Sequence, residues 1–158
     1  MIINAEEVFE MAAQIERNGR DFYLRAASMA STPEASALLS KLAKMEEKHE
    51  KLFLEIKDIF LEKKGEAVPD FDGQALSYIR AMAEGQVFSA GPIADKLKKA
   101  SSLLEIYKLA LEFEKSSLVF FSAIKKLVPG SLEKEKIDFL INEELGHIAI
   151  ISREMVAA

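Results

Sequence analysis

The sequence predicts an all-α protein built as a four-helix bundle, in which a long crossover joins two antiparallel helical hairpins. Three observations predict this class. Four long segments place apolar residues at helical spacing, and each segment has a plausible start. Two of the links between them are only a few residues long, which makes the helices they join antiparallel neighbours. The remaining link, 65–101, is much longer and contains several glycines and prolines.

The predicted helices begin at residues that suit helix N-termini. Asn4 and Glu7 have the spacing of a capping box, and Ser102 with Glu105 repeats it. Thr32, followed by proline, is a good N-cap for the second helix. We therefore expect long helices over about 5–30, 33–64, 102–128 and 132–156, with short helices near 75–84 and 93–99.

The length of the 65–101 link decides the topology. A helix of about 26 residues is about 39 Å long at 1.5 Å per residue. The link can cross that distance, so we expect the second and third long helices to run parallel. We expect one domain over residues 1–158, because nothing along the chain marks a domain boundary.

Composition excludes several classes of function. The net charge of −5 argues against a nucleic-acid partner, which would need a clustered positive surface. The chain has no cysteine, which excludes disulfides, thiol nucleophiles and cysteine-ligated iron sites. It has no apolar run long enough for a membrane span and no secretory leader, so we expect no membrane contact and a cytoplasmic location.

A duplicated spacing of glutamate and histidine carries the chemistry. The chain has only two histidines, and each lies three residues after a glutamate. Each histidine also lies 33 residues after a glutamate of the preceding helix, so the two halves superpose at an offset of 98 residues. The matched residues are Glu16 with Glu114, Glu46 with Glu144, and His49 with His147. This shared spacing indicates a duplicated helical hairpin.

The six residues lie in the middle of apolar seams, where ionisable groups need a physical reason. Burying one unpaired carboxylate costs several kcal/mol, and four close together also repel one another. No lysine or arginine occupies the seams, and Arg20 beside the first seam could neutralise one carboxylate at most. Two divalent cations would balance four glutamates. The alternative is a network of buried polar residues held by hydrogen bonds alone.

The ligand types restrict the metal. Mixed carboxylate and imidazole ligation suits iron or manganese and permits zinc, whereas magnesium and calcium prefer oxygen ligands. Because residues three apart share one face of a helix, each Glu-x-x-His pair can point at a single cluster. We therefore expect two metal ions, iron in the first place.

These residues resemble the ferritin-like di-iron carboxylate proteins, and within them the rubrerythrin group. That class has one Glu from each of two helices and a Glu-x-x-His from each of the other two. The resemblance implies a ferritin-like bundle and a redox reaction with peroxide or dioxygen. It implies terminal ligands Glu16 and Glu114, bridging ligands Glu46 and Glu144, one histidine ligand per metal from His49 and His147, and no catalytic residue beyond these.

Two departures from rubrerythrins bear on the function. The cysteine-rich rubredoxin domain is missing, so an external protein would donate electrons. Ser117 stands where rubrerythrins carry an extra glutamate, which puts a full peroxidase cycle in doubt. We expect a rubrerythrin-like peroxidase or ferroxidase, as a homodimer or higher homo-oligomer. The alternative is a non-catalytic protein that handles iron or keeps a structural dimetal site.

Two tyrosines have two open interpretations. Tyr23 and Tyr107 are either ordinary core aromatics or hydrogen-bond donors to the ligand carboxylates. With antiparallel first and third helices, both should lie at one end of the site, and Phe9 and Phe121 at the other. We expect the remaining glutamates near the seams to be solvated: Glu47, Glu50, Glu112 and Glu143.

Overall fold

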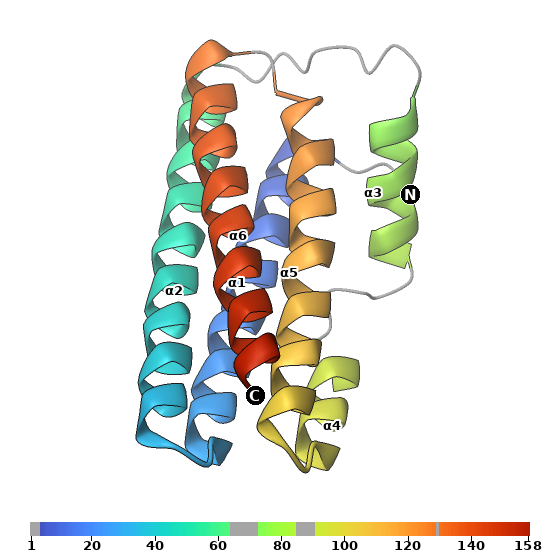
Figure 1. Cartoon of the computed structure of the whole chain (residues 1–158). Coiled ribbons are helices and arrows are strands. Elements are labelled where there is room, and N and C mark those ends of the chain that lie inside the picture. The colour runs from blue at the N-terminus through green and yellow to red at the C-terminus, as the bar shows by residue number, and fades with distance from the viewer. Residues whose placement is uncertain (1–3, 64–72, 85–90, 129) are drawn as a thin grey trace.

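The computed structural model describes residues 4–63, 73–84, 91–128 and 130–158, and every regular element in these ranges is an α-helix. None of these helices is long and apolar enough to cross a membrane. The predicted all-α bundle is confirmed (Figure 1). The helices are α1 Ala5–Met29, α2 Pro33–Glu62, α3 Gln74–Glu84, α4 Gly91–Lys99, α5 Leu103–Lys125 and α6 Ser131–Ala157.

The starts of α1 and α2 follow the sequence signals. The Asn4 side chain accepts a hydrogen bond from the Glu7 amide, and the Glu7 carboxylate accepts one from the Asn4 amide, both at 2.8 Å. This is the reciprocal capping box. The Thr32 hydroxyl accepts from the Ala35 amide at 3.2 Å, with Pro33 as the first helical residue. Local polar chemistry thus fixes where both helices of the first hairpin begin.

The ends of α5 differ from the prediction in detail. The Ser102 hydroxyl accepts from the Glu105 amide, but the Glu105 carboxylate accepts from the Ser101 amide at 2.6 Å rather than from Ser102. At the other end, the amides of Lys126 and Leu127 bond to carbonyls three residues earlier. This tightened turn ends α5 at Lys125, before the predicted residue 128.

Helix α6 begins one residue before the predicted range, and its N-cap, Gly130, has no side chain. The buried carboxylate of Glu133 lies against this turn and forms an ion pair with Lys63 Nζ at 3.0 Å. A Cβ on residue 130 would lie only 1.7 Å from Glu133 Oε2. A side chain at residue 130 would therefore have to displace the Glu133 carboxylate, and glycine leaves that carboxylate in place. The Lys63–Glu133 pair joins the end of α2 to the start of α6.

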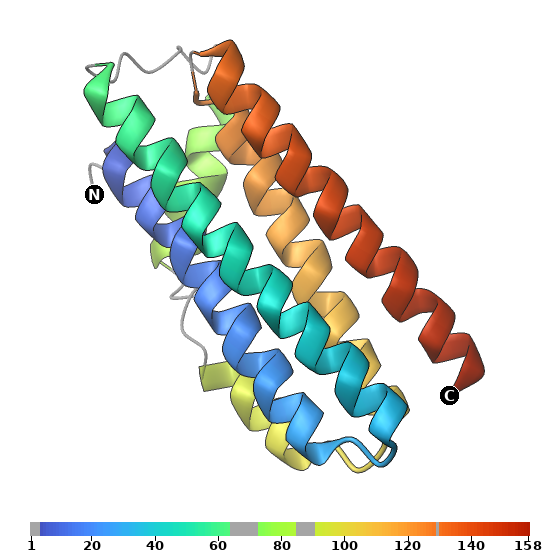
Figure 2. The same cartoon turned by 90° about the vertical axis from the view of Figure 1, so that its left-hand side faces the viewer.

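The four long helices lie side by side, with α1 and α2 forming one hairpin and α5 and α6 the other (Figures 1 and 2). Both α2 and α5 begin at the lower end of Figure 1 and run upwards, so they are parallel, as the crossover requires. Helix α3 packs against α5, and α4 packs against α1 and α5. The two short crossover helices thus lie on the outside of the bundle, α3 against α5 and α4 against both α1 and α5.

The core divides into two clusters on either side of the central glutamates and histidines. We name them by their aromatic residues. The tyrosine-end cluster includes Phe22, Tyr23, Ala26, Leu39, Leu42, Leu97, Ile106, Tyr107, Ala110 and Ile151. The phenylalanine-end cluster includes Phe9, Phe53, Ile56, Phe60, Phe120, Phe121, Ile124, Ile137 and Leu140. Both tyrosines thus share one end, with Phe9 and Phe121 at the other, so this expectation is confirmed.

Candidate metal centre

All six predicted residues meet at mid-height in the bundle. The four glutamates are fully buried, and His49 and His147 are 3% and 1% exposed. Helices α1 and α5 each contribute one glutamate, and α2 and α6 each contribute a Glu-x-x-His pair. Apolar residues precede and follow them on every helix, so these polar groups have protein rather than water around them.

The six residues form two overlapping groups, in each of which one ligand atom per residue lies within 4.8 Å of all the others. Glu46 and Glu144 belong to both groups. Glu16 and His49 complete the first group, whereas Glu114 and His147 complete the second. Two carboxylates shared between two sets of donors are the arrangement that a pair of adjacent ions requires.

Both imidazoles turn the same nitrogen toward the carboxylates. His49 Nδ1 lies 3.0 Å from Glu144 Oε1 and 3.4 Å from Glu16 Oε2. His147 Nδ1 lies 3.1 Å from Glu46 Oε1 and 3.2 Å from Glu114 Oε1. Each histidine thus approaches one glutamate of its own hairpin and one of the other hairpin. In the 98-residue repeat, the two glutamates near His49 correspond to the two near His147. The two rings stack with centroids 5.4 Å apart.

The donor atoms fit a metal better than they fit one another. Both carboxylate oxygens of Glu16, Glu46 and Glu144 are buried without a hydrogen bond from any described residue, and so is His49 Nδ1. These atoms lie close to one another but have no hydrogen-bond donor among the described residues, which is unusual for buried polar groups. Leaving so many buried acceptors unsatisfied would be very costly, and ligation of cations removes that cost.

The pKa values of the cluster describe its state without cations. Burial raises the pKa of Glu16 to about 8. Burial and the neighbouring carboxylates raise the pKa values of Glu46 and Glu144 well above the ordinary range. Burial opposes charge on His147 too, but the carboxylates of Glu114 and Glu46 close to its Nδ1 raise its pKa to about 9. Protons are therefore held in the cluster at neutral pH when no metal is bound.

Glu114 and His49 shift the other way. Burial acts to raise the pKa of Glu114, but its interactions with Glu144, His147 and Tyr23 outweigh burial and lower the pKa. Burial lowers the pKa of His49, against the pull of nearby carboxylates. Glu114 is therefore the carboxylate that stays ionised most readily, and His49 is the imidazole that stays neutral, as a metal ligand must.

The two tyrosines differ in their contacts. The Tyr23 hydroxyl donates a hydrogen bond to Glu114 Oε1. Tyr107 is also buried, but its hydroxyl has no hydrogen-bond partner within the described ranges. Of the two open interpretations, the structure places Tyr23 against a glutamate of the cluster and leaves Tyr107 in the apolar core.

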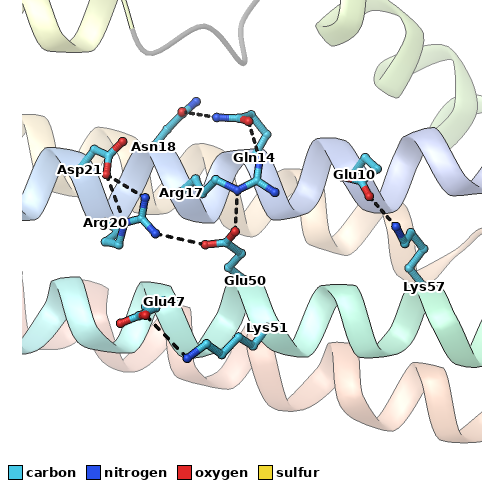
Figure 3. A network of polar contacts seen from close by, with 10 residues as sticks. All are labelled: Glu10, Gln14, Arg17, Asn18, Arg20, Asp21, Glu47, Glu50, Lys51 and Lys57. Carbon is cyan, nitrogen blue, oxygen red and sulfur yellow. Dashed lines mark hydrogen bonds and ion pairs between the residues drawn. The ribbon is translucent and has the colours of Figure 1, made fainter.

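Arginines near the cluster bind outside it. Glu50, which the sequence suggests is solvated, lies between α1 and α2 with its side chain only 14% exposed. Arg17 Nε lies 2.5 Å from Glu50 Oε1, and Arg20 Nη1 lies 3.5 Å from Oε2 (Figure 3). Arg20 also pairs with Asp21 at 3.1 Å. Both arginines thus form their ion pairs on this outer face, with Glu50 and Asp21.

Two further residues beside the cluster were missed from the sequence. Glu143 was expected at the surface, yet its Oε2 lies 3.9 Å from His49 Nε2. Gly19 lies against the cluster, since a Cβ there would stand 2.7 Å from both Glu46 Oε2 and a ring carbon of Phe113. The signal was present in the repeat, where Gly19 matches the small Ser117. Glu47 and Glu112 are exposed, as expected.

The sequence matches no protein-family model and no curated protein. Among solved structures, the chain is similar to a candidate ferritin-like diiron-carboxylate protein from Thermotoga maritima. The TM-score is 0.67 at 21% identity, over 97% of this chain and 95% of that one. At this identity the likeness concerns the fold. The chain therefore has the fold of a ferritin-like helical bundle.

Proposed function

We propose that the chain binds two metal ions at the centre of the bundle and that both ions are iron. One observation carries the proposal: buried carboxylate oxygens and a histidine nitrogen converge without hydrogen bonds, in two groups that share Glu46 and Glu144. Two divalent ions would offset the charge of four glutamates while both histidines stay neutral.

The two donor groups suggest how the ligands divide. Glu46 and Glu144 would bridge both ions, because both belong to each group. Glu16 and His49 would complete one position, and Glu114 and His147 the other. Nitrogen and oxygen donors in this mixture suit iron or manganese, and zinc is the remaining candidate. The neighbour's description as a diiron-carboxylate protein favours iron.

We further propose a redox role for this site. A bound iron pair would supply electrons to peroxide or dioxygen, with an external protein as donor. The chain's own residues would set the geometry and keep water away. Tyr23 holds Glu114 through its hydroxyl, and the apolar clusters close both ends of the site. Six ligands on two ions would also leave coordination positions for a small oxidant.

Two rubrerythrin features are absent from this sequence and narrow the proposal. There is no cysteine for a rubredoxin-type donor, and Ser117 cannot replace a carboxylate ligand. The Ser117 hydroxyl donates to the Phe113 carbonyl at 3.1 Å and is 2% exposed. The peroxidase or ferroxidase reaction would therefore proceed with a fixed set of six ligands and without an additional carboxylate.

The experiment is peroxide consumption by the iron-loaded protein under an external reductant. We expect turnover in the wild type and none in Glu46→Gln. Glu112→Gln serves as the matched control, because this glutamate is exposed and pairs with Lys96 on the surface. An iron-loaded wild type that keeps two ions but neither consumes peroxide nor oxidises ferrous iron would instead be a metal-binding protein without catalysis.

A further inference from the structure

The 98-residue repeat makes the two proposed metal positions nearly equivalent, but the surrounding residues break that equivalence. The repeat pairs Tyr23 with Phe121 and Glu143 with Met45. In each pair, one residue has a polar group where its counterpart has none. The two metal positions therefore have the same ligand types and different neighbours.

The first difference concerns the terminal glutamates. Glu114 accepts a hydrogen bond from Tyr23, which fixes its carboxylate. Neither oxygen of Glu16 accepts a hydrogen bond from a described residue. For Glu16, the residue that corresponds to Tyr23 in the repeat is Phe121, which has no hydroxyl to donate. A ligand held by a neighbour keeps its orientation when the ion leaves, so the Glu114 position is the more preorganised of the two.

The second difference concerns the outer edge of the histidines. His49 lines a hollow of about 390 Å³ between α2 and α6, together with Leu52, Phe139 and Glu143. Leu52 and Phe139 also border a second hollow of about 350 Å³ along the same face. His147, by contrast, is 1% exposed, and its Nε2 is buried without a hydrogen-bond partner in the described part of the chain.

One carboxylate of the hollow, that of Glu143, lies close to His49. Glu143 is about one-third exposed, and its Oε2 lies 3.9 Å from His49 Nε2. The wall also carries Lys48, Lys51 and Glu55, whose opposite charges offset one another in part. Lys51 is in addition paired with Glu47 at 3.6 Å. Glu143 is thus a partly exposed carboxylate close to a proposed ligand.

We infer that the two metal positions exchange their ions at different rates and by a defined route. The ion held by Glu16 and His49 enters and leaves through the hollow between α2 and α6, past Glu143. The ion held by Glu114 and His147 is retained, because Tyr23 fixes one ligand and the other, His147, is almost fully buried. This inference rests on the proposed dimetal site and adds to it an order of loading.

The test is anaerobic extraction of ferrous ions by a chromogenic chelator. We expect two phases of equal amplitude in the wild type. Glu16→Gln should leave only the slow phase, and Glu114→Gln only the fast one. Tyr23→Phe should speed the slow phase about tenfold, as the loss of a ligand's hydrogen-bond partner commonly does, and leave the fast phase unchanged.

The route is tested by changing the size and charge of the hollow. Leu52→Trp should slow the fast phase, whereas Phe139→Ala should speed it, so the two variants move it in opposite directions. Leu24→Trp, at an exposed site on α1, controls for the added indole. Glu143→Gln should slow loading of the fast position about tenfold by weakening the attraction for cations, and Glu112→Gln should not.

The possible results distinguish the dimetal site, the different exchange rates and the route. Fewer than two ions per wild-type chain would refute the dimetal site itself. Two ions released in a single phase would overturn the inference while leaving the dimetal site standing. If neither Phe139→Ala nor Glu143→Gln changes the rate of either phase, the proposed route is wrong. The route is also wrong if Leu24→Trp and Leu52→Trp have equal effects in variants that retain the wild-type circular dichroism spectrum.

Discussion

The hydroxyl of Tyr23 on α1 donates a hydrogen bond to Oε1 of Glu114 on α5, across the centre of the bundle. Glu114 Oε1 also lies 3.2 Å from His147 Nδ1. One carboxylate oxygen thus links a tyrosine of the first hairpin to a histidine of the second. Glu114 is also the glutamate of the four whose pKa is lowered.

We predict that Tyr23→Phe and Tyr107→Phe will behave differently. Tyr23→Phe removes a donor from a buried carboxylate, which should lower the free energy of unfolding by about 1–3 kcal/mol. It should also alter peroxide kinetics more than it alters iron content. Tyr107→Phe removes a hydroxyl that has no partner in the described ranges, so stability should stay the same or rise. Thermal denaturation and stopped-flow kinetics of both variants would check this, and equal behaviour would count against it.

The metal-free protein should lose stability as pH rises from about 5 to 9. The pKa of Glu16 is raised to about 8 and that of His147 to about 9, so the folded chain binds more protons than the unfolded chain in this window. The free energy of unfolding therefore falls as those protons leave. The lowered pKa of His49 acts oppositely, below its ordinary value of 6.5.

Metal should reverse this dependence, because it replaces the protons of the cluster. The rise in melting temperature on adding ferrous or manganous ion should be larger at pH 8 than at pH 6. Urea unfolding of the metal-free protein at both pH values is the accompanying measurement. A metal-free protein that is more stable at pH 8 than at pH 6 would show that the buried carboxylates are ionised without metal.

Glu46→Gln should weaken metal binding and leave the metal-free protein as stable as before, or more so. The pKa of Glu46 is raised well above its usual range, so the residue is protonated at neutral pH without metal. Glutamine copies that neutral form and removes repulsion from the neighbouring carboxylates. Isothermal titration with metal and urea unfolding without it would separate the two effects. A large loss of metal-free stability would favour a structural hydrogen-bond network instead.

Gly19→Ala and Gly146→Ala should have effects of opposite sign. Both glycines lie within helices, where alanine is ordinarily more stable by roughly 0.5–1 kcal/mol. At Gly146 a Cβ meets nothing within 4 Å, so the ordinary gain is expected. At Gly19 it would stand 2.7 Å from Glu46 Oε2, so Gly19→Ala should lower both stability and metal affinity. If Gly19→Ala is as stable as Gly146→Ala and binds metal normally, Gly19 has no role beside the cluster.

The sequence predicts the centre of the bundle well because its information is local and repeated. The Glu-x-x-His spacing puts both side chains on one helical face, and the 33-residue distances put all six residues at one height. Helix starts at Asn4 and Thr32 follow from side chains that bond the adjacent amides. None of these features depends on how far one helix is rotated against the next.

The features that the sequence did not predict depend on neighbouring helices. Glu50 looks solvated on its own helix, but Arg17 of α1 covers it. Glu143 looks solvated too, but α2 brings His49 beside it. The close approach of Glu133 to Gly130 follows from the way the Glu133 side chain folds back on the helix start. Such contacts are set by helix rotation and by rotamers, which spacing along one chain does not record.

The central claim is that four buried glutamates and two histidines hold two metal ions. The most direct measurement is the number of ions per chain, by elemental analysis of freshly purified protein and of protein reconstituted with iron and passed over a desalting column. We expect two ions per chain, falling to one or none in a Glu46→Gln, Glu144→Gln double variant. A correctly folded wild type that retains no metal under these conditions, or as much as the double variant retains, would contradict it.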